Sequence, residues 1–268
     1  MDMRRCSVAG MFYPAEPSHL EQVLEAFFRN KNPDISAHGI VSPHAGYIYS
    51  GETAACAFSA IQPDFDGTFV VIGPSHHGYM TSASAMPWET PLGVINVDKE
   101  FVDALDLRID ETSHRSEHSL EVQMPFIRYR FPRARIAPIL MGDQSYEAAM
   151  NLAEHLIDAI GRTRRDVRIV ASSDFSHYVP EVVARRQDLH VIEALKTLDI
   201  PEFYRRIIAT RATICGYGPI AAMCTVCRHL GGRRGALLRY TTSGDVTEDY
   251  NQVRSEERRV GKECSLPC

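Results

Sequence analysis

The segment Thr68-Phe-Val-Val-Ile-Gly-Pro-Ser-His-His77 is an apolar, β-branched run that stops at a glycine and passes directly into two histidines. Such a run is typical of a strand buried on both faces of a sheet. Similar runs at 39–42 and 167–172 are also followed by loops that carry histidine. In an open α/β sheet, ligands bind at the carboxyl ends of the strands. We therefore expect these three loops to meet at one edge of a sheet.

The rest of the chain alternates strand and helix patterns, which indicates βα units. This alternation predicts a three-layer α/β fold with a mainly parallel central sheet and helices on both faces. Asp98 is expected to cap a helix, and Pro125 to kink a helix or mark its start. The expected strands are 39–42, 68–72, 134–141, 167–172 and 236–243, and the expected helices are 51–62, 98–106, 117–130, 144–161, 181–197, 200–209 and 216–230.

Residues 1–253 are expected to form a single domain. Residues 254–268 are polar and mixed in charge and match no element that the preceding pattern requires, so we interpret them as a disordered or non-native tail. Cys264 and Cys268, which lie in this tail, are given no functional role.

Composition excludes several classes of protein. The chain has 268 residues, of which 44% are hydrophobic, so it can bury a core without disulfides. A net charge of −5 argues against a nucleic-acid binder. No apolar run reaches the roughly 18–20 residues of a membrane span, and the N-terminus shows no secretory h-region. Seven cysteines, an odd number, fit free thiols in a reducing compartment, so a cytoplasmic location is expected.

Two histidines and a cysteine form a candidate metal site. His44 follows the first strand, His76 follows the second, and Cys215 precedes a glycine-rich turn and a helix. A lone histidine beside a strand is usually structural, but three histidine-bearing loops at one edge favour a functional cleft. A thiol near a helix start is expected to have a lowered pKa. Imidazole and thiolate ligands suit iron, copper and zinc, and three protein ligands leave open positions for catalysis.

Further polar residues are expected around this site. Asp174 and His177 lie three residues apart, so Asp174 could orient His177 as a general acid or base. Glu117 or His118 could fix the tautomers of the ligand histidines. The alternative for Glu117 is a carboxylate favoured by the positive end of a helix.

Two other motifs are given no functional role. Cys224-Thr-Val-Cys227 lies in an expected apolar helix, where we interpret it as core packing. Gly73-Pro-Ser and Gly216-Tyr-Gly-Pro match neither a P-loop nor a dinucleotide fingerprint, so no nucleotide cofactor is expected.

Six motifs in order give the chain a resemblance to a known family. It resembles the Memo family, also described as protein B of the AmmeMemoRadiSam system, over roughly residues 4–253. The resemblance implies a fold similar to that of class III extradiol ring-cleaving dioxygenases of the LigB type. The motifs are Ala9-Gly-Met-Phe-Tyr-Pro14, Ser42-Pro-His-Ala-Gly-Tyr-Ile-Tyr-Ser-Gly51, Gly73-Pro-Ser-His-His77, Ser116-Glu-His-Ser-Leu-Glu121, Ser172-Ser-Asp-Phe-Ser-His177 and Thr213-Ile-Cys-Gly216.

The resemblance implies one metal ion at His44, His76 and Cys215, with iron first and copper or zinc as alternatives. It favours His76 over His77 as the ligand, with His77 supporting it. In the ring-cleaving dioxygenases two histidines and a carboxylate hold Fe(II), and another histidine acts as acid and base. Cys215 stands where the carboxylate would be. A thiolate tolerates Cu(I) and Zn(II) and can itself be oxidised, which argues against catechol dioxygenation.

The resemblance also implies partners: a functional link to a radical-SAM protein and an AMMECR-type protein, and a small molecule or peptide as the substrate. It shows one departure, because the family closes with a small-residue, apolar strand where this chain has charged residues from Arg254 onward.

Three functions follow as hypotheses. The first is a metal-dependent oxidoreductase in which His177 moves protons. The second is a non-catalytic module that binds a peptide or protein in the same cleft, and the third is a zinc-type hydrolase. The binding module would use aromatic side chains near the loops, whose alternative role is packing of the cleft wall: Tyr13, Tyr47, Tyr49, Tyr79 and Tyr178.

Overall fold

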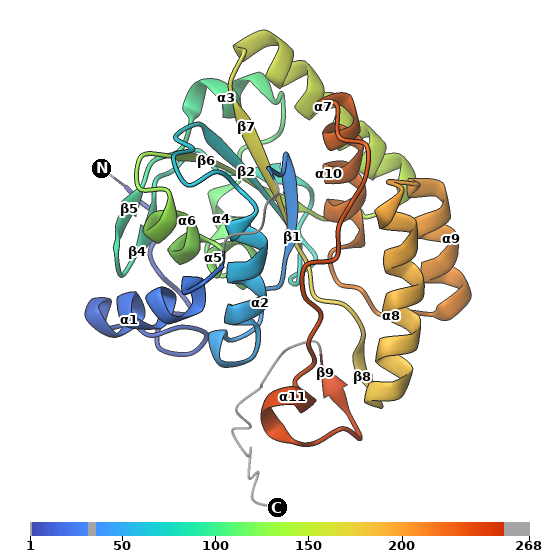
Figure 1. Cartoon of the computed structure of the whole chain (residues 1–268). Coiled ribbons are helices and arrows are strands. Elements are labelled where there is room, and N and C mark those ends of the chain that lie inside the picture. The colour runs from blue at the N-terminus through green and yellow to red at the C-terminus, as the bar shows by residue number, and fades with distance from the viewer. Residues whose placement is uncertain (1, 32–35, 255–268) are drawn as a thin grey trace, which may run out of the picture.

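The computed structural model describes residues 2–31 and 36–254 and has a mixed, mostly parallel sheet at its centre (Figure 1). The strand order is β1-β7-β2-β6-β3, and β3 alone in this sheet runs antiparallel. The predicted α/β class and mainly parallel sheet are confirmed. The strands of the sheet are β1 (Gly39–Ser42), β2 (Thr68–Pro74), β3 (Ser82–Ala83), β6 (Arg135–Met141) and β7 (Val167–Ser172).

Two small antiparallel pairs lie outside the central sheet. One joins β4 (Trp88–Thr90) to β5 (Gly93–Ile95), and the other joins β8 (His177–Val179) to β9 (Val253–Arg254). Arg254, where the tail was expected to begin, therefore still takes part in a strand. The remaining residues of the expected tail, 255–268, lie outside the described residues.

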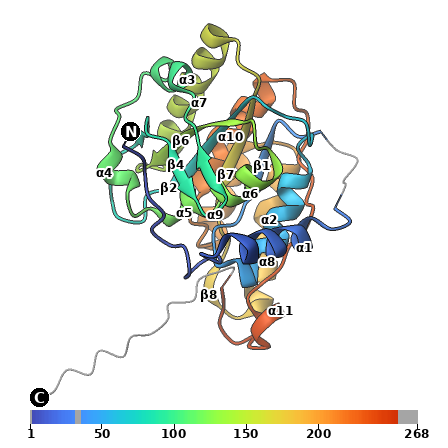
Figure 2. The same cartoon turned by 90° about the vertical axis from the view of Figure 1, so that its left-hand side faces the viewer.

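Helices pack on both faces of the sheet (Figures 1 and 2). One face is covered by α3 (Lys99–Ala104), α7 (Tyr146–Thr163) and α10 (Tyr217–His229), and the other by α1 (Pro17–Phe28), α2 (Tyr47–Ser59), α5 (His118–Glu121) and α6 (Met124–Arg130). The pair α8 (Glu181–Lys196) and α9 (Ile200–Thr210) packs beside α10. Two further short helices are α4 (Glu111–His114) and α11 (Gly244–Thr247). None of the described helices is both long and apolar enough to cross a membrane.

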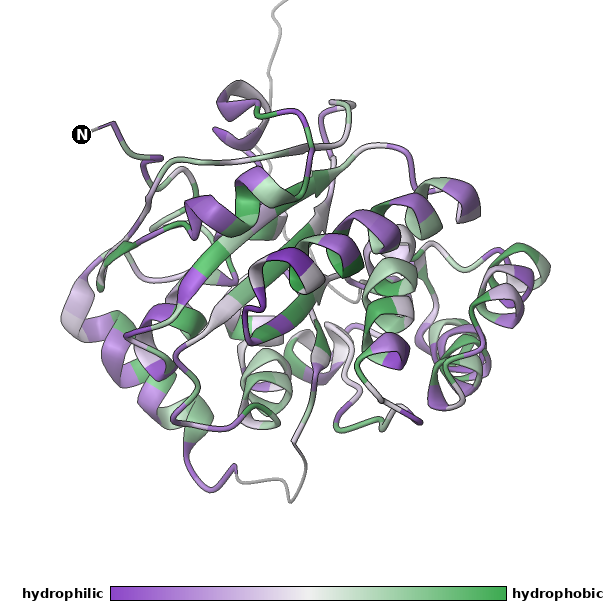
Figure 3. Cartoon of the chain, turned by 90° about the horizontal axis from the view of Figure 1, so that it is seen from above, coloured by the Kyte–Doolittle hydropathy of each residue, from purple (hydrophilic) through white to green (hydrophobic). Residues whose placement is uncertain are grey.

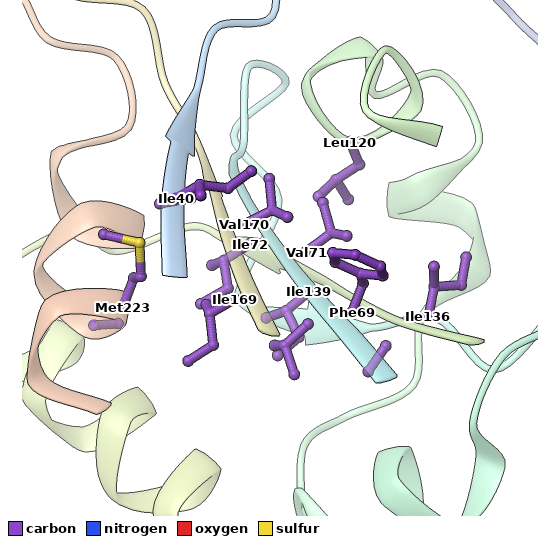
Figure 4. Close-up of a cluster of buried hydrophobic side chains, with 14 of the residues drawn as sticks. Ile40, Phe69, Val71, Ile72, Leu120, Ile136, Ile139, Ile169, Val170 and Met223 are labelled. Carbon is purple, nitrogen blue, oxygen red and sulfur yellow. The ribbon is translucent and has the colours of Figure 1, made fainter. Parts of the chain in front are cut away.

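Strand β2 shows why its own sequence is apolar over several consecutive residues. Phe69 packs against Phe58 of α2 and against Phe131, whereas the alternation of side chains directs Val70 and Ile72 to the opposite face, where α10 contacts the strand. All residues of β2 are buried. Figure 3 shows that the central strands are mostly hydrophobic and that the helices around them carry both hydrophilic and hydrophobic residues, and Figure 4 shows buried apolar side chains of the sheet, among them Phe69, Ile72 and Ile139. Burial on both faces requires the continuous apolar run seen in the sequence.

Most predicted elements are confirmed, with shifts at their ends. Asp98 caps α3 by accepting a hydrogen bond from the backbone N–H of Phe101. The expected helix 117–130 is divided into α5 and α6, and Pro125 lies in the first turn of α6. Cys224 and Cys227 are buried core residues, as predicted.

One expected strand was wrong, and one long helix was not expected. Residues 236–243 form no strand in the described part of the chain, although they run alongside β1. A strand needs a paired neighbour, and this segment has none. Helix α1 was not predicted, although Glu16 caps it by accepting hydrogen bonds from the N–H groups of Ser18 and His19.

Glu121 ties the N-terminal segment to α5. Its fully buried carboxylate pairs with the guanidinium of Arg4 and accepts hydrogen bonds from the N–H groups of Ser7 and Val8, each at 3.0 Å, and from the hydroxyl of Tyr13 at 2.6 Å. Burial raises the pKa of this carboxyl, but Arg4 and the hydrogen bonds outweigh burial and hold the pKa below its usual value. The ionised carboxylate is therefore the stable form.

We expect Glu121→Gln to lower the free energy of unfolding by about 3 kcal/mol, because the charge of Arg4 would stay buried without its partner. The pKa of Glu121 is lower in the folded than in the unfolded protein, so its contribution is present above the unfolded pKa and is lost as pH falls through the folded pKa. The deficit of the variant should thus shrink on acidification. Urea unfolding at several pH values measures it. The exposed Glu154→Gln is the control, and an equal effect of both variants would contradict this role.

Candidate metal centre

The site lies at the carboxyl ends of three neighbouring parallel strands. His44 comes two residues after β1, His76 two residues after β2, and Asp174 two residues after β7. Cys215 comes from a distant segment, just before α10. The ligand atoms of His44, His76 and Cys215 all lie within 4.8 Å of one another. Bonds of about 2.0–2.3 Å place the ligands of one ion no more than about 4–5 Å apart, so these three residues can hold one ion.

The His44 ring is fixed by a serine of the neighbouring strand. Ser172 Oγ donates a hydrogen bond to the carbonyl of Ser119 at 2.6 Å, so it is free to accept one from His44 Nδ1 at 2.9 Å. His44 Nε2 is then left with its lone pair, 3.1 Å from Cys215 Sγ. Burial, together with His118 and the other nearby histidines, lowers the pKa of His44 well below its usual value. The neutral imidazole is the form that binds metal.

The His76 ring is fixed by a buried carboxylate. Glu117 accepts hydrogen bonds from His76 Nδ1 at 2.8 Å and from the backbone N–H of His76 at 2.9 Å, and it also caps α5 through Ser119 N–H at 3.0 Å. Burial raises the pKa of Glu117, but the contacts with His76 outweigh it and lower the pKa to about 2. Glu117 is therefore ionised, and His76 Nε2 is available for an ion. Carboxylate–histidine–metal triads have this arrangement.

Cys215 is held by backbone contacts that require a glycine beside it. Its sulfur accepts a hydrogen bond from Asp174 N–H at 3.1 Å. A Cβ atom at Gly216 would lie only 2.4 Å from the carbonyl oxygen of Ser172, so no larger residue fits there without a shift of the backbone. Burial and the nearby Asp174 carboxylate raise the pKa of the Cys215 thiol well above its usual value. The expected lowering by the helix start was wrong, because burial dominates.

Asp174 and His177 lie beside the thiol. Asp174 accepts a hydrogen bond from the backbone N–H of His44 at 2.9 Å, and Asp174, His177 and Cys215 form a second group with ligand atoms within 4.8 Å. His177 Nδ1 lies 2.8 Å from the carbonyl of Thr213, which can only accept, so Nδ1 carries the proton.

A third imidazole completes the cluster. The His118 ring lies 4.5 Å from that of His76 and 5.4 Å from that of His44, measured between centroids. His76, Glu117 and His118 form another group that could hold an ion. His77 lies outside these groups: it is exposed, and its ring lies 6.4 Å from that of Tyr79.

The expected cleft tyrosines differ in their burial. Tyr13 and Tyr47 are buried, and their hydroxyls bond to Glu121 and to the carbonyl of Val122, respectively, which is the alternative role of wall packing. Tyr49 is half-buried on α2. Tyr79 and Tyr178 are exposed.

Sequence reasoning missed the residues that orient the ligands from behind. Ser172 holds His44, Thr213 holds His177, and Gln123 donates hydrogen bonds to Ser172 Oγ and to the carbonyl of Pro43. The available signal was the pair Ser172-Ser173 at the end of a buried strand, directly before Asp174.

The fold and these side chains define a class: an α/β protein with a candidate site for a single metal ion, formed by two imidazoles at strand ends and a thiol just before α10. The chain belongs to the Memo family, because residues 4–258 match the family described as Memo-like protein. It is 43% identical over 258 residues to a MEMO1 family protein of Methanosarcina barkeri, covering 94% of this chain and 97% of the relative. It is 44% identical over 256 residues to one of Archaeoglobus fulgidus, covering 94% and 96%, respectively.

We expect Glu117→Gln to weaken metal binding by about 10–100-fold, because a neutral amide no longer favours the proton on His76 Nδ1. The glutamine can still accept the hydrogen bond of Ser119 that caps α5. Competition of Zn²⁺ with a chelator dye measures the affinity. Glu147→Gln on α7 serves as the control. Unchanged affinity in the Glu117 variant would show that this carboxylate only caps the helix.

Proposed function

We propose that this Memo-family protein binds one redox-active metal ion, iron first, through His44 Nε2, His76 Nε2 and Cys215 Sγ. One observation carries the proposal. Both histidines commit Nδ1 to a fixed acceptor, so each would bind an ion through Nε2, and the ligand atoms that His44, His76 and Cys215 offer lie within 4.8 Å of one another. Histidines with only a structural role would not need to carry their protons on the same ring nitrogen next to a thiol. Copper and zinc also suit this ligand set and are the alternatives.

We further propose that the site belongs to a metal-dependent oxidoreductase. A bound redox metal would supply electron-transfer chemistry, and three protein ligands would leave positions open to a substrate. His177 would accept or return a proton at Nε2, its ring held by Thr213. Asp174, which holds the backbone of His44 and contributes N–H to the sulfur, would keep the ligands in place. The resemblance to LigB-type dioxygenases supports this class of reaction, whereas the thiolate distinguishes the site from theirs.

A zinc-type hydrolase is the second candidate. The observation that favours it is the mixed nitrogen and sulfur ligand set, which zinc accepts without redox chemistry. A zinc-bound water would then be the nucleophile, and His177 would be the nearby base. The identity of the metal in freshly isolated protein distinguishes the two candidates.

Partners and location are part of the same proposal. The resemblance to protein B of the AmmeMemoRadiSam system supports a functional link with a radical-SAM protein and an AMMECR-type protein, and a small molecule or peptide as the substrate. The described cysteines are all free thiols, which fits a cytoplasmic location: Cys6, Cys56, Cys215, Cys224 and Cys227.

We expect the isolated protein to hold about one iron or copper per chain by elemental analysis, and His44→Ala or Cys215→Ser to lose it, because each removes one of three protein ligands. Loading with Co²⁺ gives an independent readout. The thiolate-to-cobalt absorption should be present in the wild type and absent from Cys215→Ser.

The controls are His190→Ala, which changes an exposed histidine, and Cys56→Ser, which changes a half-buried thiol. Both should keep the metal and the cobalt absorption. Full metal occupancy in His44→Ala and in Cys215→Ser would refute the proposed site. One zinc per chain, with no redox response, would favour the hydrolase.

A further inference from the structure

A groove of about 880 Å³ runs along the outer edge of β1. Its walls come from β1, from helices α2, α8 and α10, and from the extended segment 231–241. In Figure 1 this segment descends beside β1 toward α11. The volume falls within the range of about 300–1,000 Å³ that ligand sites occupy.

Strand β1 presents unpaired backbone groups to this groove. The carbonyl of His38 accepts a hydrogen bond from Ile169 of β7, and that of Ser42 accepts one from Ser173, directly after β7, each at 3.0 Å. Because the backbone groups of a strand alternate in direction, those of Gly39 and Val41 point away from β7. Among the described strands, β7 is the only one that pairs with β1. Two N–H and two C=O groups thus face the groove, in the pattern that an added strand would satisfy.

The surfaces around this edge are apolar. Met223 and Cys227 of α10 line the groove with Leu195 of α8. On the opposite wall, Leu237 and Leu238 are exposed by 42% and 39%. Exposure of these apolar side chains to water is unfavourable in free energy. A strand bound between β1 and this segment would cover them.

The rim of the groove is basic, although the whole chain carries a net charge of −5. Lys196, Arg233, Arg234 and Arg239 line it. Lys196 pairs with Glu193, and Arg239 pairs with Glu52. Arg233 and Arg234 are exposed and make no ion pair with a residue that the structure describes. Their charge complements an acidic ligand.

We propose that the β1 groove binds an extended acidic peptide as an additional β-strand, which pairs with Gly39 and Val41 and places a carboxylate beside Arg233 and Arg234. Strand addition of this kind takes its affinity from main-chain hydrogen bonds and its specificity from pockets for alternate side chains. Here the pockets are the apolar floor and the guanidinium pair. The proposal does not rest on the proposed metal site, because His44, His76 and Cys215 do not line the groove.

The test uses the full chain and a fluorescein-labelled peptide of alternating valine and threonine with an aspartate at each end. We expect saturable binding by fluorescence anisotropy, and about tenfold weaker binding to the double variant Arg233→Glu, Arg234→Glu. The matched control is Arg115→Glu, Arg186→Glu, which makes the same change in charge at exposed positions elsewhere and should bind like the wild type. Hydrogen exchange at Gly39 and Val41 should slow when the peptide is bound.

Two control peptides separate the contributions. A peptide with lysine in place of aspartate should bind at least about tenfold more weakly, and a peptide N-methylated at alternate residues should lose the slowed exchange along β1. The proposal is overturned if the acidic peptide fails to bind at about 1 mM, or if the N-methylated peptide binds equally well. It is also overturned if the edge is protected before peptide is added, because a second copy or another segment of this chain would then fill the groove.

Discussion

The parallel pairing of β1, β7 and β2 is the constraint on which the candidate site depends. The register sets Ser42 opposite Ser172 and Ile72 opposite Ala171, so the three strands end at nearly the same level. The loops that follow these strands therefore lie close together, at the edge of the sheet where ligands bind in α/β proteins. Residues that are far apart in the sequence therefore meet at one end of the sheet, and the buried core of the sheet holds their loops in place.

Buried polar groups behind His44 and His76 determine which tautomer each histidine adopts. Glu117 and Ser172 each serve one histidine and one backbone group of α5, so the helix and the rings are positioned by the same hydrogen bonds. Buried polar atoms are costly unless they are satisfied. Their satisfaction here fixes both tautomers in advance, and little reorganisation is left for an incoming ion.

The sequence predicted most of the sheet because its strands carry their own signal: β2 is apolar from Phe69 to Ile72, β7 is apolar from Ile169 to Ala171, and both end next to polar loops. The sequence also predicted that His44, His76 and Cys215 lie together. The two histidines follow expected strands, and the resemblance to the family implied all three residues. Prediction from the sequence failed where the outcome depends on neighbours. Residues 236–243 have a strand-like composition but lack a paired edge, and the pKa of Cys215 follows burial, which residue order does not reveal.

One short loop separates the two sites. Residues 173–175 line the β1 groove, and Asp174 also holds the backbone of His44. If an occupant of one side favoured a different position of Asp174, it would change the affinity of the other side, and the effect would be equal in both directions. Because only this short loop lies between the two sites, a small movement of the loop would be enough to couple two ligands, and no domain would have to move.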